Sequence, residues 1–126
     1  MMGEVVLVID DNPVNLRLTS LVLASEGFEV ATARDAEDAL AVIGVRRPRL
    51  VLTDLQLPGM DGLALTRRLK ADPETRGIVV VALTAFAMMG DEARALEAGC
   101  DGYLTKPIDT RTLGPVVARL LTSGAR

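Results

Sequence analysis

The sequence predicts an α/β fold, in which a five-stranded parallel sheet is doubly wound, with helices on both faces. Short apolar runs alternate with amphipathic segments along the 126 residues, and the runs never pair as hairpins. Three of the runs are nearly continuous and rich in Val and Leu, which is typical of strands buried on both faces. Strands and helices that alternate in this way form one sheet with right-handed crossovers.

Five strands are expected. The strong runs are VVLVID (5–10), RLVLTD (49–54) and IVVVALT (78–84). The runs FEVATA (28–33) and GYLTKP (102–107) are weaker, and we expect them at or near the edges of the sheet.

The first two helices have clear start signals. Asn12 caps the first, Pro13 occupies its first position and Gly27 ends it. Asp35 opens the second helix. The apolar faces expected for these helices are Val14, Leu18, Leu21 and Val22 for the first, and Ala36, Ala39, Leu40 and Ile43 for the second.

Three further helices are expected at about 62–70, at about 88–98 before Gly99, and at the end of the chain. The last helix presents Leu113, Val116, Val117, Leu120 and Leu121 at helical spacing. If Asp109 were its cap, Pro115 would lie beyond the first turn, where it removes a hydrogen bond and clashes. We therefore favour Thr112 as the cap over a kinked helix.

Composition excludes several classes of function. The net charge of −3, with basic residues scattered, argues against nucleic acid as the direct partner, and three aromatic residues make no base-stacking platform. The absence of histidine excludes Ser-His-Asp and Cys-His catalysis and removes the commonest ligand of zinc. Cys100, the single cysteine, excludes an internal disulfide and is interpreted as a small buried hydrophobe.

No repeat, linker or second domain is visible, so residues 1–126 are interpreted as one domain. No apolar run is long enough to cross a bilayer, and no targeting segment is visible, so we expect a cytoplasmic protein without a membrane partner.

Polar residues follow the strong strands where those strands end. The first strand delivers Asp10 and Asp11, the third Asp54, the fourth Thr84 and the fifth Lys106. The carboxyl ends of parallel strands share one edge, where ligands bind in such folds. Three neighbouring carboxylates need a cation, and oxygen-only ligands suit Mg²⁺. With a hydroxyl and a lysine, this set suits the transfer of a phosphoryl group to a carboxylate.

These motifs resemble those of the receiver domains of two-component response regulators. The likeness rests on the acidic pair, the aspartate of TDLQLPGMDG, the threonine that ends the fourth strand, and KP after the fifth. It covers the whole chain and is strongest with stand-alone receivers of the DivK type and with receivers of hybrid kinases. The resemblance implies a flavodoxin-like (βα)5 fold with strand order 2-1-3-4-5.

The resemblance also implies a role for each site residue. Asp54 would accept the phosphoryl group from a sensor histidine kinase or a histidine phosphotransfer protein. Asp11 would bind Mg²⁺ directly, Asp10 largely through water, and the backbone carbonyl of Gln56 would be a further ligand.

Two site residues and one aromatic would act on the phosphoryl group or respond to it. Thr84 and Lys106 would bind phosphoryl oxygens. Tyr103 stands where the family has its switch aromatic, and its inward turn would change the face built from the fourth helix, fifth strand and fifth helix. The output would be contact with a downstream effector protein rather than an enzymatic reaction.

Alternatives remain open at this point. The chain fits a complete single-domain regulator, but a receiver excised from a larger hybrid kinase or regulator would look nearly the same. An aspartyl-phosphate phosphohydrolase would need a second aspartate where Gln56 stands. A degenerate receiver would bind partners without phosphate. Gly59 and Gly62 serve either a turn or a close backbone approach.

Overall fold

A computed structural model of the chain describes residues 4–55, 57, 59–84, 91–105 and 109–124. Its five strands are β1 (Val5–Ile9), β2 (Glu29–Ala33), β3 (Leu50–Asp54), β4 (Val79–Thr84) and β5 (Gly102–Thr105). All neighbouring strands pair in parallel, in the order β2-β1-β3-β4-β5. The predicted flavodoxin-like fold and strand order are confirmed, and the two weaker strands are the two edges.

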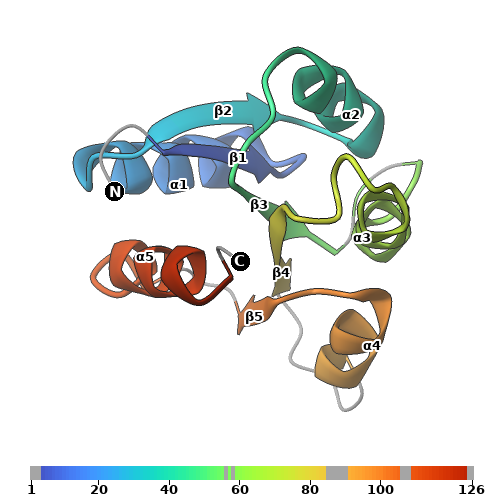
Figure 1. Cartoon of the computed structure of the whole chain (residues 1–126). Coiled ribbons are helices and arrows are strands. Elements are labelled where there is room, and N and C mark those ends of the chain that lie inside the picture. The colour runs from blue at the N-terminus through green and yellow to red at the C-terminus, as the bar shows by residue number, and fades with distance from the viewer. Residues whose placement is uncertain (1–3, 56, 58, 85–90, 106–108, 125–126) are drawn as a thin grey trace.

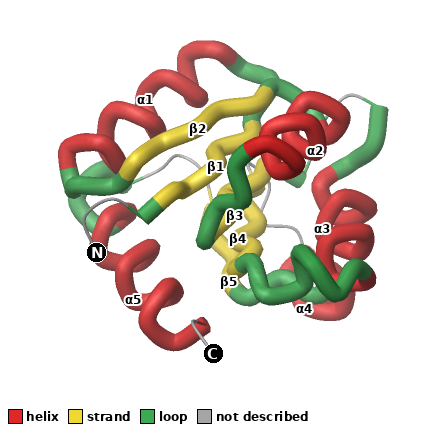
Figure 2. Tube along the Cα trace, turned by 45° about the horizontal axis from the view of Figure 1, so that its top comes forward, coloured by secondary structure: helices red, strands yellow, loops and turns green. Residues whose placement is uncertain are grey.

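The five described helices are α1 (Pro13–Ser25), α2 (Ala36–Val45), α3 (Gly62–Ala71), α4 (Asp91–Ala98) and α5 (Leu113–Gly124). Figure 1 shows α1 and α5 on one face of the sheet and α2, α3 and α4 on the other. In the tilted view of Figure 2 the strands lie between these two layers. None of the helices traced in the described ranges is both long and apolar enough to cross a bilayer.

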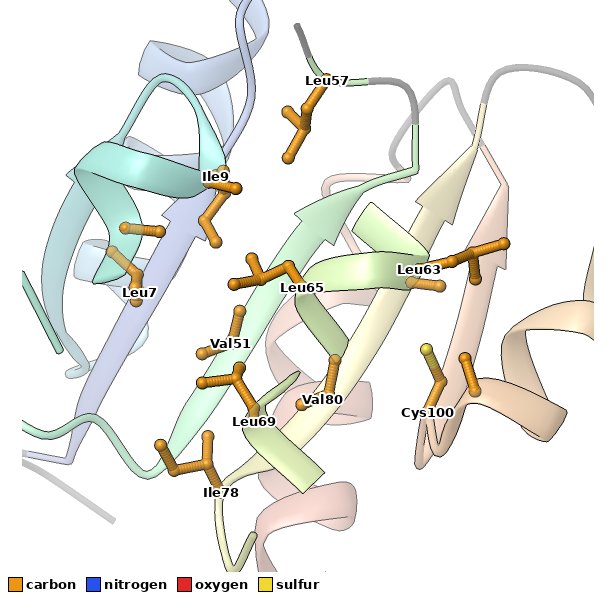
Figure 3. Close-up of a cluster of buried hydrophobic side chains, with 14 of the residues drawn as sticks. Leu7, Ile9, Val51, Leu57, Leu63, Leu65, Leu69, Ile78, Val80 and Cys100 are labelled. Carbon is orange, nitrogen blue, oxygen red and sulfur yellow. The ribbon is translucent and has the colours of Figure 1, made fainter. Parts of the chain in front are cut away.

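The central strands bury side chains on both faces, as their nearly continuous apolar runs predict. In β1, Leu7 and Ile9 join the cluster under α2, α3 and α4, whereas Val6 and Val8 join the cluster under α1 and α5. Figure 3 shows the first cluster, in which Leu65 of α3 lies over the sheet with its neighbours. Each fully buried side chain of this kind contributes about 1.5–3 kcal/mol of hydrophobic stabilisation.

Helix α1 begins as predicted but turns a different face to the core. The Asn12 side chain accepts hydrogen bonds from the backbone amides of the first turn, and Gly27 follows the helix with a φ of 97°. The expected inner face is wrong for three of its four residues, because Val14, Leu18 and Leu21 are 73 %, 43 % and 60 % exposed. Val22, the fourth, packs against the core cluster as expected. Leu23 and Thr19 are buried instead. Apolar residues occur on nearly every side of this helix, so their spacing does not select one face.

Helix α5 begins at Leu113, after a turn in which the Asp109 carbonyl accepts from the amides of Thr112 and Leu113. The assignment of Thr112 as the cap stays a prediction. The Thr112 carbonyl accepts from the Val116 amide at 2.9 Å, and Pro115 lies in the first turn, where a backbone N–H has no partner within the helix. Of the helix expected at about 88–98, the structure describes Asp91–Ala98, and the earlier part lies outside the described residues.

Candidate functional site

Three carboxylates gather at the carboxyl edge of the sheet. Strands β1 and β3 are neighbours with Ile9 opposite Thr53, so the residues that follow, Asp10 and Asp54, are brought side by side. Each of Asp10, Asp11 and Asp54 offers a carboxylate oxygen, and these atoms all lie within 4.8 Å of one another. Asp10 and Asp54 are buried, whereas Asp11 is exposed. The structure thus brings together the three aspartates that the sequence selects.

The backbone around Asp10 is fixed by its neighbours. The Asp10 amide donates to the carbonyl of Ala33 in the adjacent strand at 3.2 Å, and Asp10 Oδ1 accepts from the Asn12 amide at 2.9 Å. The cap of α1 is supplied by Asn12 and not by either aspartate. The ordinary structural explanation for an acidic pair after a strand, capping of the next helix, therefore does not apply here.

The donor set of this cluster fits a hard divalent cation. Like-charged carboxylates this close repel one another, and a cation between them offsets that repulsion. All three groups offer only oxygen, and one of them is exposed, which leaves a side for water or for an anionic ligand. Such a set could hold Mg²⁺, which prefers a few carboxylates and keeps several waters.

The segment after Asp54 is held by backbone hydrogen bonds. The Leu55 amide donates to the carbonyl of Leu83 in β4 at 3.0 Å, and Thr53 Oγ1 donates to the Asp54 carbonyl at 3.0 Å. The Gly62 amide, at the start of α3, donates to the Leu55 carbonyl at 3.1 Å. The ends of the loop 55–62 are thereby joined directly beside Asp54.

The two glycines of this loop have different reasons to be glycine. Gly59 has a φ of 75°, a conformation that favours glycine in a turn. Gly62 lies against the backbone of Asp54 and Leu55, so that a Cβ there would clash. The alternatives left open by the sequence are resolved as one turn and one close approach.

Thr84 is the buried last residue of β4, and it lies at the same edge because Asp54 pairs with Leu83 beside it. Tyr103 is half-buried in β5, opposite Ala82, and packs against the cluster under α2, α3 and α4. Thr84 therefore reaches the site edge, whereas Tyr103 lies further back along its strand. The phosphoryl-binding role of Thr84 and the switch role of Tyr103 stay predictions.

Lys106 and Gln56 lie outside the described residues, so the roles expected for the lysine side chain and for the Gln56 carbonyl also stay predictions. Lys106 follows Thr105, which pairs with Thr84.

Comparison with protein families gives one match that spans most of the chain. The model described as "Response regulator receiver domain" matches residues 6–118. The polar-differentiation response regulator DivK of Brucella anthropi is 42% identical over 107 residues, which cover 85% of this chain and 87% of DivK. The response regulator PleD of Caulobacter vibrioides is 45% identical over 108 residues, which cover 86% of this chain but only 24% of PleD.

Solved structures with the same architecture are also similar in sequence. A putative response regulator from Chloroflexus aurantiacus matches with a TM-score of 0.91 and 32% identity, covering 95% of this chain and 98% of that one. A signal receiver domain of a histidine kinase from Syntrophus aciditrophicus matches with a TM-score of 0.88 and 33% identity, covering 96% and 92%.

Proposed function

The chain belongs to the response regulator receiver family, and from that premise we propose that it is a phosphorylation-dependent signalling switch whose acceptor is Asp54. The observation that supports this most is the gathering of Asp10, Asp11 and Asp54 at the carboxyl edge of the sheet. Among these, Asp54 ends the central strand β3 and stands next to Thr84 of β4 across the sheet edge.

In the proposed reaction, a carboxylate oxygen of Asp54 attacks the phosphorus of the donor. The new O–P bond forms as the bond from phosphorus to the donor nitrogen of a phosphohistidine breaks, which leaves an aspartyl phosphate and a neutral histidine once a proton is taken up. Mg²⁺ would offset negative charge on the phosphoryl oxygens. Asp10 and Asp11 would hold the cation, the Thr84 hydroxyl would donate to one phosphoryl oxygen, and the Lys106 ammonium would pair with another.

The output would be a change of surface rather than a second reaction. Movement of Thr84 toward the phosphoryl group would leave room for the Tyr103 ring, which already lies half-buried against the core. This would shift a pre-existing equilibrium of the α4–β5–α5 face toward the form that an effector protein binds.

A sensor histidine kinase or a histidine phosphotransfer protein would be the donor. Support comes from α1, which begins two residues after Asp11 and exposes Val14, Leu18 and Leu21 along one side. Scattered exposed apolar residues are ordinary, but a valine and two leucines at helical spacing beside an acidic site offer an apolar docking surface. A protein donor bound there would stand next to Asp54.

The test is intact-mass measurement after incubation with Mg²⁺ and a small acyl phosphate. The wild type should gain one phosphoryl group, and the gain should vanish in Asp54→Asn and when Mg²⁺ is chelated. A gain that persists in Asp54→Asn would place the acceptor elsewhere. Steady hydrolysis of a generic phosphate ester would favour a phosphohydrolase instead, and we expect none.

A further inference from the structure

The first residue of α3 touches the peptide of the proposed acceptor, and its lack of a side chain makes that contact possible. We propose that Gly62 is a positioning residue: its contact with the Asp54–Leu55 backbone sets where the Asp54 carboxylate stands relative to Asp10 and Asp11. Replacing Gly62 by alanine would then slow phosphoryl transfer and weaken Mg²⁺ binding. This inference rests on the function proposed above and adds a residue that does no chemistry itself.

The contact is tighter than any ordinary side chain allows. A Cβ on Gly62 would lie 2.4 Å from the Asp54 carbonyl oxygen, 2.9 Å from Leu55 Cα and 3.2 Å from the Asp54 carbonyl carbon. All three atoms belong to the backbone, so no flexible side chain can move away to make room. Either the start of α3 or the end of β3 must shift.

Backbone conformation does not require glycine at this position. The glycines with a positive φ are Gly27, Gly59 and Gly99, and Gly62 is not among them. Asp61 already caps α3, because its Oδ1 accepts from the Ala64 amide at 2.8 Å. Within a helix glycine is less favourable than alanine by about 1 kcal/mol. The close approach to Asp54 is therefore what the missing Cβ serves.

Hydrogen bonds hold both sides of the contact. On the α3 side, Thr66 Oγ1 donates to the Gly62 carbonyl at 2.8 Å, and the Gly62 amide donates to Leu55. On the β3 side, Thr53 Oγ1 donates to the same Asp54 carbonyl that the Cβ would strike. Because the Gly62 amide is bonded to the Leu55 carbonyl, a shift of either side to admit an alanine would be transmitted to the acceptor segment.

The size of the displacement sets the expected effect. An ordinary contact begins near 3.4 Å, which is about 1 Å longer than the 2.4 Å from a Gly62 Cβ to the Asp54 carbonyl oxygen. Misplacement of a reacting group by about 1 Å can cost about a hundredfold in rate. We expect Gly62→Ala to slow phosphoryl gain by about tenfold to a hundredfold and to weaken Mg²⁺ binding, since Asp54 contributes to both.

Gly44→Ala is the matched control. Gly44 lies in α2, and a Cβ there would meet nothing within 4 Å, so the same chemical change should leave both measurements as in the wild type. The initial rate is read by intact mass with a small acyl phosphate at saturating Mg²⁺. Mg²⁺ affinity is read separately by calorimetry, without a phosphodonor.

A second control separates positioning from a general loss of stability. Leu69→Val removes a buried methylene two turns further along α3 and should lower the thermal midpoint without changing the Mg²⁺ affinity of the folded protein. Gly62→Ala should change that affinity. If Gly62→Ala lowers only the thermal midpoint, or equals the wild type in both measurements, the proposal is wrong.

The proposal can still be tested if Gly62→Ala does not fold or if the wild type gains no phosphoryl group. If Gly62→Ala does not fold, Thr53→Val, which removes the hydroxyl bound to the Asp54 carbonyl, takes its place; a wild-type rate and affinity in that variant would overturn the proposal. If the wild type gains no phosphoryl group, the proposed function fails, while the comparison of Mg²⁺ affinities still tests the positioning role of Gly62.

Discussion

Charged residues are arranged differently at the amino ends and at the carboxyl ends of the strands, which we call the amino edge and the carboxyl edge of the sheet. At the amino edge, acids and bases pair: Glu4 with Arg49 at 2.7 Å, and Asp101 with Lys70 at 2.9 Å. At the carboxyl edge, three carboxylates stand within 4.8 Å of one another. Opposite charges that meet within the chain stabilise the fold, whereas like charges gathered in one place suit the binding of something from outside. We therefore propose that the charges at the amino ends of the strands stabilise the fold, and that those at the carboxyl ends serve the proposed phosphoryl transfer.

Lys70 makes several hydrogen bonds at the amino edge. Its Nζ donates to the carbonyls of Arg76 and Ile78 at 3.3 and 2.7 Å, as well as to Asp101 Oδ2. The same Asp101 oxygen accepts from the Val80 amide at 2.9 Å. One lysine therefore ties the end of α3 to the start of β4 and to the residue before β5.

The largest change in the free energy of unfolding is expected when the hydrogen bonds of Lys70 are removed. Lys70→Met should lower the free energy of unfolding by about 2 kcal/mol, because hydrogen bonds to charged groups contribute about 1.5–3 kcal/mol and the Asp101 carboxylate loses its counter-ion. Urea unfolding measures the loss. The rate of phosphoryl gain per folded molecule should stay that of the wild type, since the carboxyl edge is untouched.

Arg47→Met is the control for that variant. The Arg47–Glu74 pair spans 3.4 Å with both side chains more than half exposed, and exposed pairs contribute about 0–1 kcal/mol. Equal losses in the two variants would show that Lys70 is an ordinary surface lysine.

A smaller effect of opposite sign is expected at the carboxyl edge. With Mg²⁺ chelated, Asp11→Asn should raise the free energy of unfolding by about 0.5 kcal/mol, because it removes one like charge at an exposed position. We also expect Mg²⁺ to stabilise the wild type by binding at this site, and the variant should lose most of that stabilisation. Asp101→Asn should instead destabilise the protein to the same extent with and without Mg²⁺. Destabilisation by Asp11→Asn in the chelator would contradict the comparison.

The features that depend on short stretches of sequence, such as strands and helix caps, were mostly predicted correctly. Continuous apolar runs identified the central strands, and the weaker ones proved to be the edges. Caps at Asn12 and Asp35 were confirmed, since short polar side chains bind the amides of the next turn. The gathering of Asp10, Asp11 and Asp54 was also predicted correctly, because neighbouring parallel strands place their carboxyl ends on the same side of the sheet.

Features decided by tertiary packing were missed or left open. Most of the predicted inner face of α1 was wrong, because a helix with apolar residues on nearly every side docks by fit to the sheet and buries Leu23 rather than Leu21. The Lys70–Asp101 pair joins residues far apart in the chain, so no local pattern reveals it. The reason for Gly62 needed the position of Asp54 in space.

The most direct test of the comparison is a titration of the isotope-labelled protein with Mg²⁺, followed by amide proton–nitrogen spectra. The account predicts that the largest shifts fall on Asp10, Asp11, Asp54 and their neighbours, and that they disappear in Asp11→Asn. The amide signals of Glu4 and Asp101 should keep their chemical shifts. Shifts spread over the acids of both edges, or a response that Asp11→Asn leaves intact, would contradict the assignment of chemistry to the carboxyl edge.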